Sequence, residues 1–283
     1  MNKDESATQN EPQAGAEDTA GGSLKGARKP IEIRTITSGD VIDAIGDGVM
    51  DLARAPLYGF AFGGFYAAFG WILLAAIFYF NFDLYAFPLA TGFALIAPFV
   101  AAGCYEVSRR LEAGEPLRWG PVLGIVRRGG RNDLNWMVVV TVFAYIIWID
   151  IAMALYVIFF GLNPLSLPEL VIAVFTTLPG VVFFIIGSLV GAVLSVVVFS
   201  ITAISFPILF ERNIDFVTAM ITSVRAVKAN PGAMAFWGVT IGLALGISIL
   251  SAFVALIVVL PVFGHTTWHL YRRLIGPPDK DEA

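Results

Sequence analysis

Long apolar segments separated by short polar stretches run through most of the sequence. Between Ala55 and Cys104 the only charged side chain is Asp83, and Pro231 to Gly264 contains none. Runs of about 18 or more apolar residues are long enough to cross a bilayer as helices. The pattern therefore predicts an all-α, polytopic transmembrane helix bundle. It places spans at about Leu57–Phe80, Tyr85–Cys104, Asn135–Phe160 and Val181–Leu209, followed by a last apolar run at Ala233–Val262.

The last apolar run has two interpretations. As one helix it would be ~45 Å long at a rise of ~1.5 Å per residue, and it would leave Arg272 and Arg273 on the outer side of the membrane. As a hairpin of two short helices that turns near Gly246–Ser251, it would place both arginines inside. No strong turn residue in that stretch decides between the two.

A short internal repeat favours the hairpin. Pro98 and Pro261 are each followed by Arg-Arg-Leu at offsets of 11, 12 and 13 residues, and Tyr105 matches Trp268. Pro207 begins a looser third copy. If each copy marks a helix that returns to the cytoplasm, the bundle has six helices in three hairpins, with five helices as the alternative. Short interfacial helices are expected within 122–126 and 169–178.

Polar segments flank the apolar region. Residues 1–30 lack aromatic side chains and predict a disordered cytoplasmic tail. Residues 31–54 predict an amphipathic juxtamembrane helix with Ser38 as its N-cap, residues 55–274 the transmembrane domain, and residues 275–283 a polar C-terminal tail. One face of the juxtamembrane helix is acidic, which argues for docking on protein or facing solvent rather than lipid. This face carries Asp40, Asp43, Asp47 and Asp51.

Composition and charge distribution agree with a membrane protein. Hydrophobic residues make up 57% of the chain and charged residues 14%, compared with about 25% charged in an ordinary soluble domain. Lys and Arg gather in alternate loops, while the loops at Asn81 and Gly161 contain none. The positive-inside rule therefore places the N-terminus in the cytoplasm. The main cytoplasmic basic loop, Tyr105–Leu134, includes Arg109, Arg110, Arg127, Arg128 and Arg131.

Several segments resemble one known family. They are GCYEVSRRLEAGEP at Gly103–Pro116, TSVRAVKANPGAMAFWG at Thr222–Gly238, LPVFGHTTWHLYRRL at Leu260–Leu274 and ARAPLYGFAFGGFYAAFGWILL at Ala53–Leu74. They are similar to the Domain of Unknown Function 2189 family of predicted integral membrane proteins of proteobacteria, over about residues 31–274. The resemblance implies a multi-helix fold in the bacterial inner membrane. It implies no activity and assigns no functional residue.

Asp150 is the sharpest polar feature within a predicted span. It lies about 22 Å into the third span at ~1.5 Å per residue, and an Asp at a helix centre costs about 2.5–3.5 kcal/mol on insertion. Because no span contains a Lys or Arg to pair with it, we expect a neutral carboxyl that hydrogen-bonds a neighbouring helix, with Ser188, Ser195 and Thr240 as candidate partners. The alternative is a proton or cation relay.

The two histidines, His265 and His269, share one helix face through their i,i+4 spacing. This spacing suits a pair of metal ligands, but the segment offers no third ligand. Trp268 and Tyr271 beside them favour a location at the membrane interface. We therefore expect no metal site and no cofactor, with the two histidines as weak metal candidates.

Glycines recur at small-xxx-small spacing, which lets helices approach closely. This spacing predicts helix packing, either within the chain or between copies, at Gly59 and Gly63, at Gly187 and Gly191, and at Gly238, Gly242 and Gly246.

The sequence lacks the motifs of nucleotide hydrolysis, dinucleotide binding, serine hydrolases and zinc proteases, so we expect no enzyme. It also lacks the basic, aromatic surface that nucleic-acid binding needs. Two function classes remain. One is a non-catalytic inner-membrane protein that scaffolds, assembles or regulates a membrane complex. The other is a small transporter or channel that uses Asp150. The expected partners are the lipid bilayer and either other membrane proteins or further copies of the chain.

Overall fold

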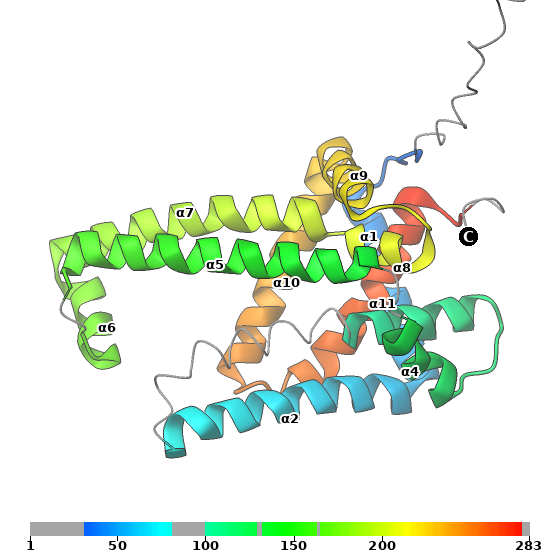
Figure 1. Cartoon of the computed structure of the whole chain (residues 1–283), viewed down its shortest axis with the longest axis horizontal. Coiled ribbons are helices and arrows are strands. Elements are labelled where there is room, and N and C mark those ends of the chain that lie inside the picture. The colour runs from blue at the N-terminus through cyan, green and yellow to red at the C-terminus, as the bar shows by residue number, and fades with distance from the viewer. Residues whose placement is uncertain (1–30, 81–99, 129–131, 163–164, 279–283) are drawn as a thin grey trace, which may run out of the picture. The chain divides into compact units, whose positions relative to one another are not determined.

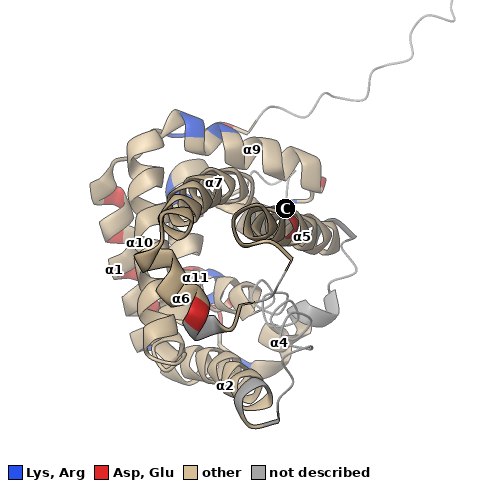
Figure 2. Cartoon of the chain, turned by 90° about the vertical axis from the view of Figure 1, so that its left-hand side faces the viewer, with Lys and Arg blue, Asp and Glu red and all other residues tan. Residues whose placement is uncertain are grey.

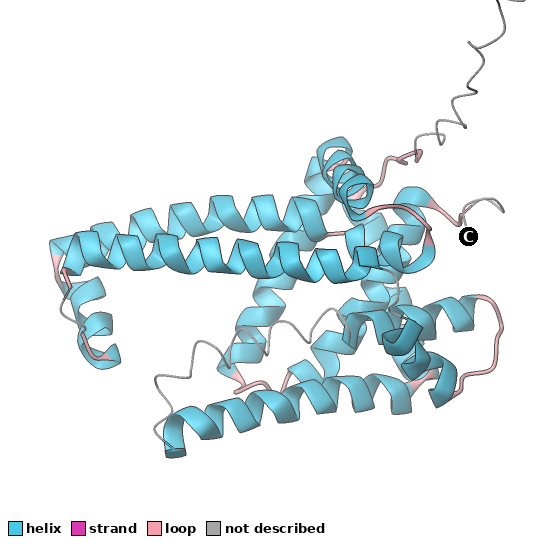
Figure 3. Cartoon of the chain, viewed as in Figure 1, coloured by secondary structure: helices cyan, strands magenta, loops and turns pink. Residues whose placement is uncertain are grey.

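The computed structural model describes residues 31–80, 100–128, 132–162 and 165–278, and these consist of helices and loops without a strand (Figures 1 and 3). Residues Glu32–Ala283 form one unit and Met1–Ile31 another, and only the first of these is considered below. The all-α prediction is confirmed. The predicted N-terminal tail, residues 85–99 of the second predicted span, and residues 279–283 lie outside the described residues.

Four stretches of the described chain are long and apolar enough to cross a membrane. They correspond to the first, third and fourth predicted spans and to the first part of the last apolar run. The predicted number of six helices stays a prediction, since much of the second span is not described. The helices are α2 (Pro56–Phe80), α5 (Asn132–Phe160), α7 (Leu178–Thr202) with the short α8 (Ser205–Glu211) after it, and α10 (Pro231–Leu250).

The last apolar run is broken, as the hairpin interpretation required. Helix α10 ends at Leu250 and α11 (Leu256–Ile275) begins six residues later, so the turn lies slightly beyond the predicted Gly246–Ser251. In this turn Ala252 and Phe253 have φ angles of 48° and 67°. Non-glycine residues rarely adopt this left-handed conformation, which explains why no turn residue marked the break in the sequence.

The polar stretches between the spans are more helical than expected. Residues 100–112 form a helix, so the prediction of a loop over Tyr105–Leu134 is wrong at its start. The predicted interfacial segments 122–126 and 169–178 fall within or overlap α4 (Trp119–Arg128) and α6 (Leu167–Thr176). A further helix, α9 (Phe216–Ala229), occupies the polar stretch before α10.

The N-cap of helix α1 (Ser38–Arg54) lies one residue before the predicted cap. Thr37, rather than Ser38, is the N-cap, because its hydroxyl accepts the Asp40 backbone N–H while the Asp40 carboxylate accepts the Thr37 backbone N–H. This reciprocal pair is a capping box, which satisfies two otherwise unpaired donors. The face of α1 that is buried includes Val41, Ala44 and Gly48.

Helix α11 packs against α1, α2, α8 and α10. Two glycines permit the closest approaches. A Cβ at Gly48 of α1 would collide with Thr266, and a Cβ at Gly63 of α2 would collide with the backbone of Ile257. The buried residues of α11 include both apolar side chains, such as Leu270, and polar ones, such as His265 and Thr266.

Helices α5 and α7 differ from this arrangement. They run side by side and are joined at one end by α6, which packs on α7 (Figure 1). Their membrane-spanning windows contain no buried residue. Large apolar side chains such as Phe143, Ile158 and Val193 are more than half exposed, so the described residues do not cover these helices.

The turn between α10 and α11 supports a first prediction. Replacing Ala252 by Gly removes the steric cost of a left-handed Cβ, which outweighs the entropic cost of a glycine, so the free energy of unfolding should rise by about 0.5–1 kcal/mol. Ala255, with a φ of −63°, is the matched control, and Ala255→Gly should lower stability instead. Thermal unfolding of both variants in detergent tests this, and a destabilised Ala252→Gly protein would contradict the turn geometry.

Candidate functional site

The two histidines of α11 lie in a buried polar cluster. The i,i+4 spacing places both on one face of the helix. Ser108, from the 100–112 helix, lies 2.8 Å from Nδ1 of His265, and the Asp51 carboxylate of α1 lies 2.7 Å from Nε2 of His269. His265 and Ser108 are completely buried, and Asp51 is 3% exposed. The cluster therefore joins three helices that are far apart in the sequence.

Burial and hydrogen bonding oppose each other in this cluster. For Asp51, burial acts to raise the pKa, but hydrogen bonds with His269 and Ser108 outweigh it, so the pKa lies below its ordinary value of 3.8. For His265, which lies beyond the predicted apolar run, burial lowers the pKa from 6.5 to about 4, despite the nearby charge of Asp51. His265 is therefore neutral at pH 7, as a buried imidazole without a charged hydrogen-bond partner should be.

Serine, histidine and aspartate meet here without forming a nucleophilic relay. Such a relay needs the acid to orient the same histidine that contacts the nucleophile. Here Ser108 contacts His265, whereas Asp51 contacts His269. Nor do the described residues include a group of three His, Cys, Asp or Glu side chains that could hold a metal ion. The cluster is a hydrogen-bond network that links α1, the 100–112 helix and α11.

The residues expected at the membrane interface are covered by protein rather than exposed to lipid. Trp268 and Tyr271, taken as interfacial, are completely buried by protein, as is His265. The acidic face of α1 likewise docks on protein through part of its length. Asp51 is buried against α11, and Asp47 lies 2.7 Å from Arg273, whereas Asp43 is exposed. Of the two interpretations of the acidic face, docking on protein therefore holds for Asp51 and, through its ion pair with Arg273, for Asp47.

A second, charged cluster lies one turn further along α11. Arg272 forms two hydrogen bonds of 2.6 Å with Glu211 of α8 and one of 3.0 Å with Glu112 of the 100–112 helix. The Tyr271 hydroxyl donates to Glu211 at 2.7 Å and accepts from Arg212 at 3.1 Å. A paired arginine presents several donors in a fixed plane, so one side chain can link several elements.

The basic residues of the predicted cytoplasmic loop are only partly described. Arg109 and Arg110 lie on the 100–112 helix, where both pair with Glu106 and Glu115. They are thus neutralised within the chain. Arg127 and Arg128 belong to α4, though their side chains are not described, and Arg131 lies outside the described residues.

The internal repeat corresponds to a physical contact. Its matched aromatic residues, Tyr105 and Trp268, stack with their ring centroids 6.4 Å apart, and Phe210 packs edge-on against both. The two Arg-Arg pairs each lie near the C-terminal end of a helix, where cations are favoured by the helix dipole. Pro98, at the start of the first copy, lies outside the described residues.

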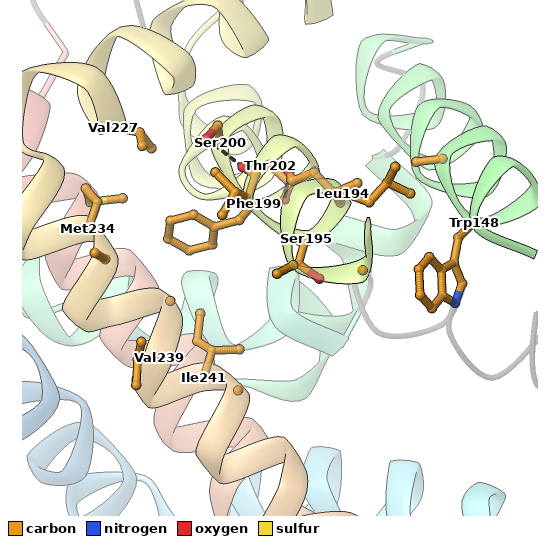
Figure 4. Close-up of a pocket in the computed structure, with 18 of the residues that line it drawn as sticks. Trp148, Leu194, Ser195, Phe199, Ser200, Thr202, Val227, Met234, Val239 and Ile241 are labelled. Carbon is orange, nitrogen blue, oxygen red and sulfur yellow. Dashed lines mark hydrogen bonds between the residues drawn. The ribbon is translucent and has the colours of Figure 1, made fainter. Parts of the chain in front are cut away.

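A groove of about 920 Å³ is lined by residues of α5, α7 and α10 and by Val227 of α9. Figure 4 shows Trp148 of α5 on one side, Leu194 and Phe199 of α7 between, and Met234 of α10 on the other side. Three hydroxyls in its lining, those of Thr141, Ser200 and Thr202, each donate to the carbonyl four residues earlier in their own helix. The surface of the groove is therefore almost entirely apolar.

Asp150 does not have the environment expected for it. It is exposed on α5, it does not line the groove, and among the described residues nothing hydrogen-bonds to its carboxylate. The expected interhelical bond is thus not formed with any residue that the structure describes. Of the candidate partners, Thr240 donates to the carbonyl of Phe236 in its own helix.

The glycine series divides into two groups. An added Cβ would contact a neighbouring helix at Gly59, Gly63 and Gly191, so these positions pack within the chain, and at Gly238 it would only touch Phe199. At the remaining three positions an added Cβ would meet nothing within 4 Å: Gly187, Gly242 and Gly246.

Sequence reasoning missed Ser108, Glu112, Glu211 and Tyr271 as parts of the two clusters. Each is a polar side chain next to an apolar run, which is the one signal the sequence offered. Their hydrogen-bond and ion-pair partners lie on other helices, and only the fold determines which helices meet. Figure 2 shows the resulting segregation, with charges on α1 and α9 and none on α7.

Burial of His265 predicts a specific pH dependence. Between pH 6.5 and about 4 the unfolded imidazole binds a proton that the folded one does not, so stability falls as pH falls through this window. The total loss should be about 3 kcal/mol. The contribution of Asp51 is lost at lower pH, because its pKa is lowered from 3.8.

Unfolding free energies in detergent between pH 4 and 7 measure this loss. The His265→Gln protein, which retains a polar side chain but cannot titrate, should lose most of the slope. An unchanged slope in this variant would assign the pH dependence to other groups.

The charged cluster predicts that two arginine substitutions lower the free energy of unfolding by different amounts. Arg272→Ala should lower the free energy of unfolding by about 3 kcal/mol, because it leaves Glu211, 10% exposed, without its partner. Arg54→Ala is the control, because Arg54 is 60% exposed and 3.9 Å from Asp51. It should change stability by no more than about 0.5 kcal/mol. Equal losses on chemical denaturation would contradict this assignment.

Comparison with known proteins bears on the family resemblance. Neither the curated proteins nor the solved structures give a significant match to the chain. One family model does match. The segment that it covers includes Gly103–Pro116. The other three segments that carry the family resemblance lie outside it. The recognised resemblance is thereby confirmed over residues 86–211, where the chain matches DUF2189, a family described as predicted integral membrane proteins.

Proposed function

We propose that this integral membrane protein is a non-catalytic scaffold of the bacterial inner membrane, with its N-terminus in the cytoplasm, that assembles or regulates a complex of membrane proteins. The observation that carries this proposal is the contrast between two parts of the described chain. The helices around α11 are joined by buried polar clusters, whereas the spanning windows of α5 and α7 contain no buried residue.

A rigid base with uncovered spanning helices is suited to a scaffold. Hydrogen bonds and ion pairs link α11 to α1, the 100–112 helix and α8, so the base presents a fixed surface. The apolar faces of α5 and α7 then meet either lipid or another protein. Gly187, with open space around it, provides a point where a second helix could approach closely.

The alternative function is a small transporter or channel that uses Asp150. A transport pathway needs polar groups that replace the hydration shell of an ion or substrate. The groove beside α5 is apolar, and Asp150 does not line it. Its exposed position on α5 equally suits a hydrogen bond to a partner helix, which would satisfy the carboxyl within the membrane. These features favour the scaffold.

A steric test of assembly separates the two functions. The chain is extracted from native membranes in mild detergent, and the size of its complex is compared between wild type and Gly187→Leu. The scaffold predicts a complex larger than the chain alone, and its loss in the variant, because leucine blocks helix approach. Gly64→Leu is the control, since Gly64 also has open space around it but lies on α2.

A wild-type chain that migrates alone would overturn the scaffold. The transporter would gain support if this protein, reconstituted in liposomes, conducted an ion and Asp150→Asn abolished the flux.

A further inference from the structure

Helix α5 exposes a narrow stripe along its membrane-spanning part. In a heptad repeat that starts with Trp136 as position a, every exposed residue between Met137 and Tyr156 lies at position a, d or e. No residue of this stretch at position b, c, f or g is exposed. The a and d positions of the stripe are Trp136, Val139, Phe143, Ile146, Asp150 and Met153, and all of them are exposed.

A stripe of this shape is the contact surface of a helix that packs against one other helix. It extends over about 26 Å at ~1.5 Å per residue, which is most of a hydrocarbon core of ~30 Å. Helix α7, beside α5, differs, because runs of neighbouring residues are exposed on it, including Phe184–Ile186 and Ser195–Val197. Such a broad apolar surface suits contact with lipid, whereas the stripe on α5 suits a second helix.

Asp150 occupies an a position of the stripe and is its only ionisable residue. Nothing among the described residues hydrogen-bonds to its carboxyl, and hydrocarbon offers no hydrogen bond. A single polar residue at an a position specifies the register in which two helices pair. The helix that covers the stripe therefore has to present a polar group at the depth of Asp150.

A second copy of the chain meets this requirement through its own sequence. Two copies insert in the same orientation, because the same loop charges orient both, so their α5 helices run parallel and at equal depth. Around a twofold axis along the membrane normal, each a residue faces its counterpart, and Asp150 faces Asp150. A carboxyl that keeps its proton both donates and accepts hydrogen bonds, so two of them are complementary to each other.

We propose that two copies of this chain pair through the exposed stripe of α5, with their Asp150 carboxyls hydrogen-bonded to each other within the bilayer. The apolar a and d residues provide the packing, and the carboxyl pair determines the register. This pairing goes beyond the scaffold function, because it requires no other membrane protein.

Cysteine cross-linking tests the contact, because the only cysteine of the chain, Cys104, is buried and the wild type serves as the blank. The purified full-length chain is reconstituted in phosphatidylcholine liposomes at a low protein-to-lipid ratio and oxidised. Ile146→Cys and Met153→Cys should each give a disulfide-linked dimer in several-fold higher yield than Val193→Cys. Val193 is the matched control, since it lies on α7 and is about as exposed as Met153.

Two substitutions test the carboxyl pair, with energy transfer between copies labelled at the N-terminus as the measure of dimerisation. Asp150→Leu should weaken dimerisation by about 5- to 30-fold, the effect of hydrogen bonds between helices in model membrane peptides. Asp150→Asn should stay close to wild type, because a carboxamide also donates and accepts. Both variants should fold, since residue 150 is exposed on α5.

Three outcomes would overturn the proposal. Equal yields from Met153→Cys and Val193→Cys would mean random collision between copies. A chain that forms no cross-linked dimer would mean that lipid or another protein segment covers the stripe. Dimerisation that Asp150→Leu leaves unchanged would mean that the carboxyls do not pair.

Failure of the scaffold is recognised separately. The Gly187→Leu comparison measures a complex extracted from native membranes, whereas the cross-linking uses the purified chain alone. Seam-specific cross-links in a chain whose native complex ignores Gly187→Leu would support the dimer and count against the scaffold. The reverse pair of results would overturn the dimer alone.

Discussion

The burial of polar side chains on α11 is the constraint on which the described fold depends. A buried charge or hydrogen-bonding group is costly unless a partner replaces the water it loses. His265, His269 and Arg272 therefore require Ser108, Asp51 and Glu211, which come from three other helices. These bonds are directional, so they specify how α1, the 100–112 helix and α8 meet α11 in a way that apolar contacts alone could not.

The spanning helices follow a different rule. A helix whose backbone is satisfied internally needs no further hydrogen bonds in lipid, and its apolar side chains are as well solvated by acyl chains as by protein. The windows of α5 and α7 can therefore remain unburied without cost in a membrane. This freedom leaves both the apolar groove and the open glycines available to lipid or to another protein.

The internal repeat shows that a short sequence pattern can predict which helices are related. The spacing from proline to Arg-Arg suggested related helices, and the stacking of Tyr105 on Trp268 shows that the matched positions meet in the fold. The hairpin at the end of the chain was one of two open interpretations, because its turn uses Ala252 and Phe253 rather than glycine. Close packing of α2 on Ile257 of α11 and a hydrogen bond from Trp71 of α2 to the Ala252 carbonyl accompany this turn, and sequence alone does not reveal these contacts.

The sequence by itself determined the helical, membrane-spanning class, most of the helix positions and the segregation of charge. These depend on hydrophobicity and periodicity, which are local properties of the chain. Only the tertiary structure decided that Asp51 is buried rather than solvated, that the histidines bind protein side chains, and that Asp150 is exposed. A polar side chain is stable in several environments, and the one it occupies depends on partners that lie far away in the sequence.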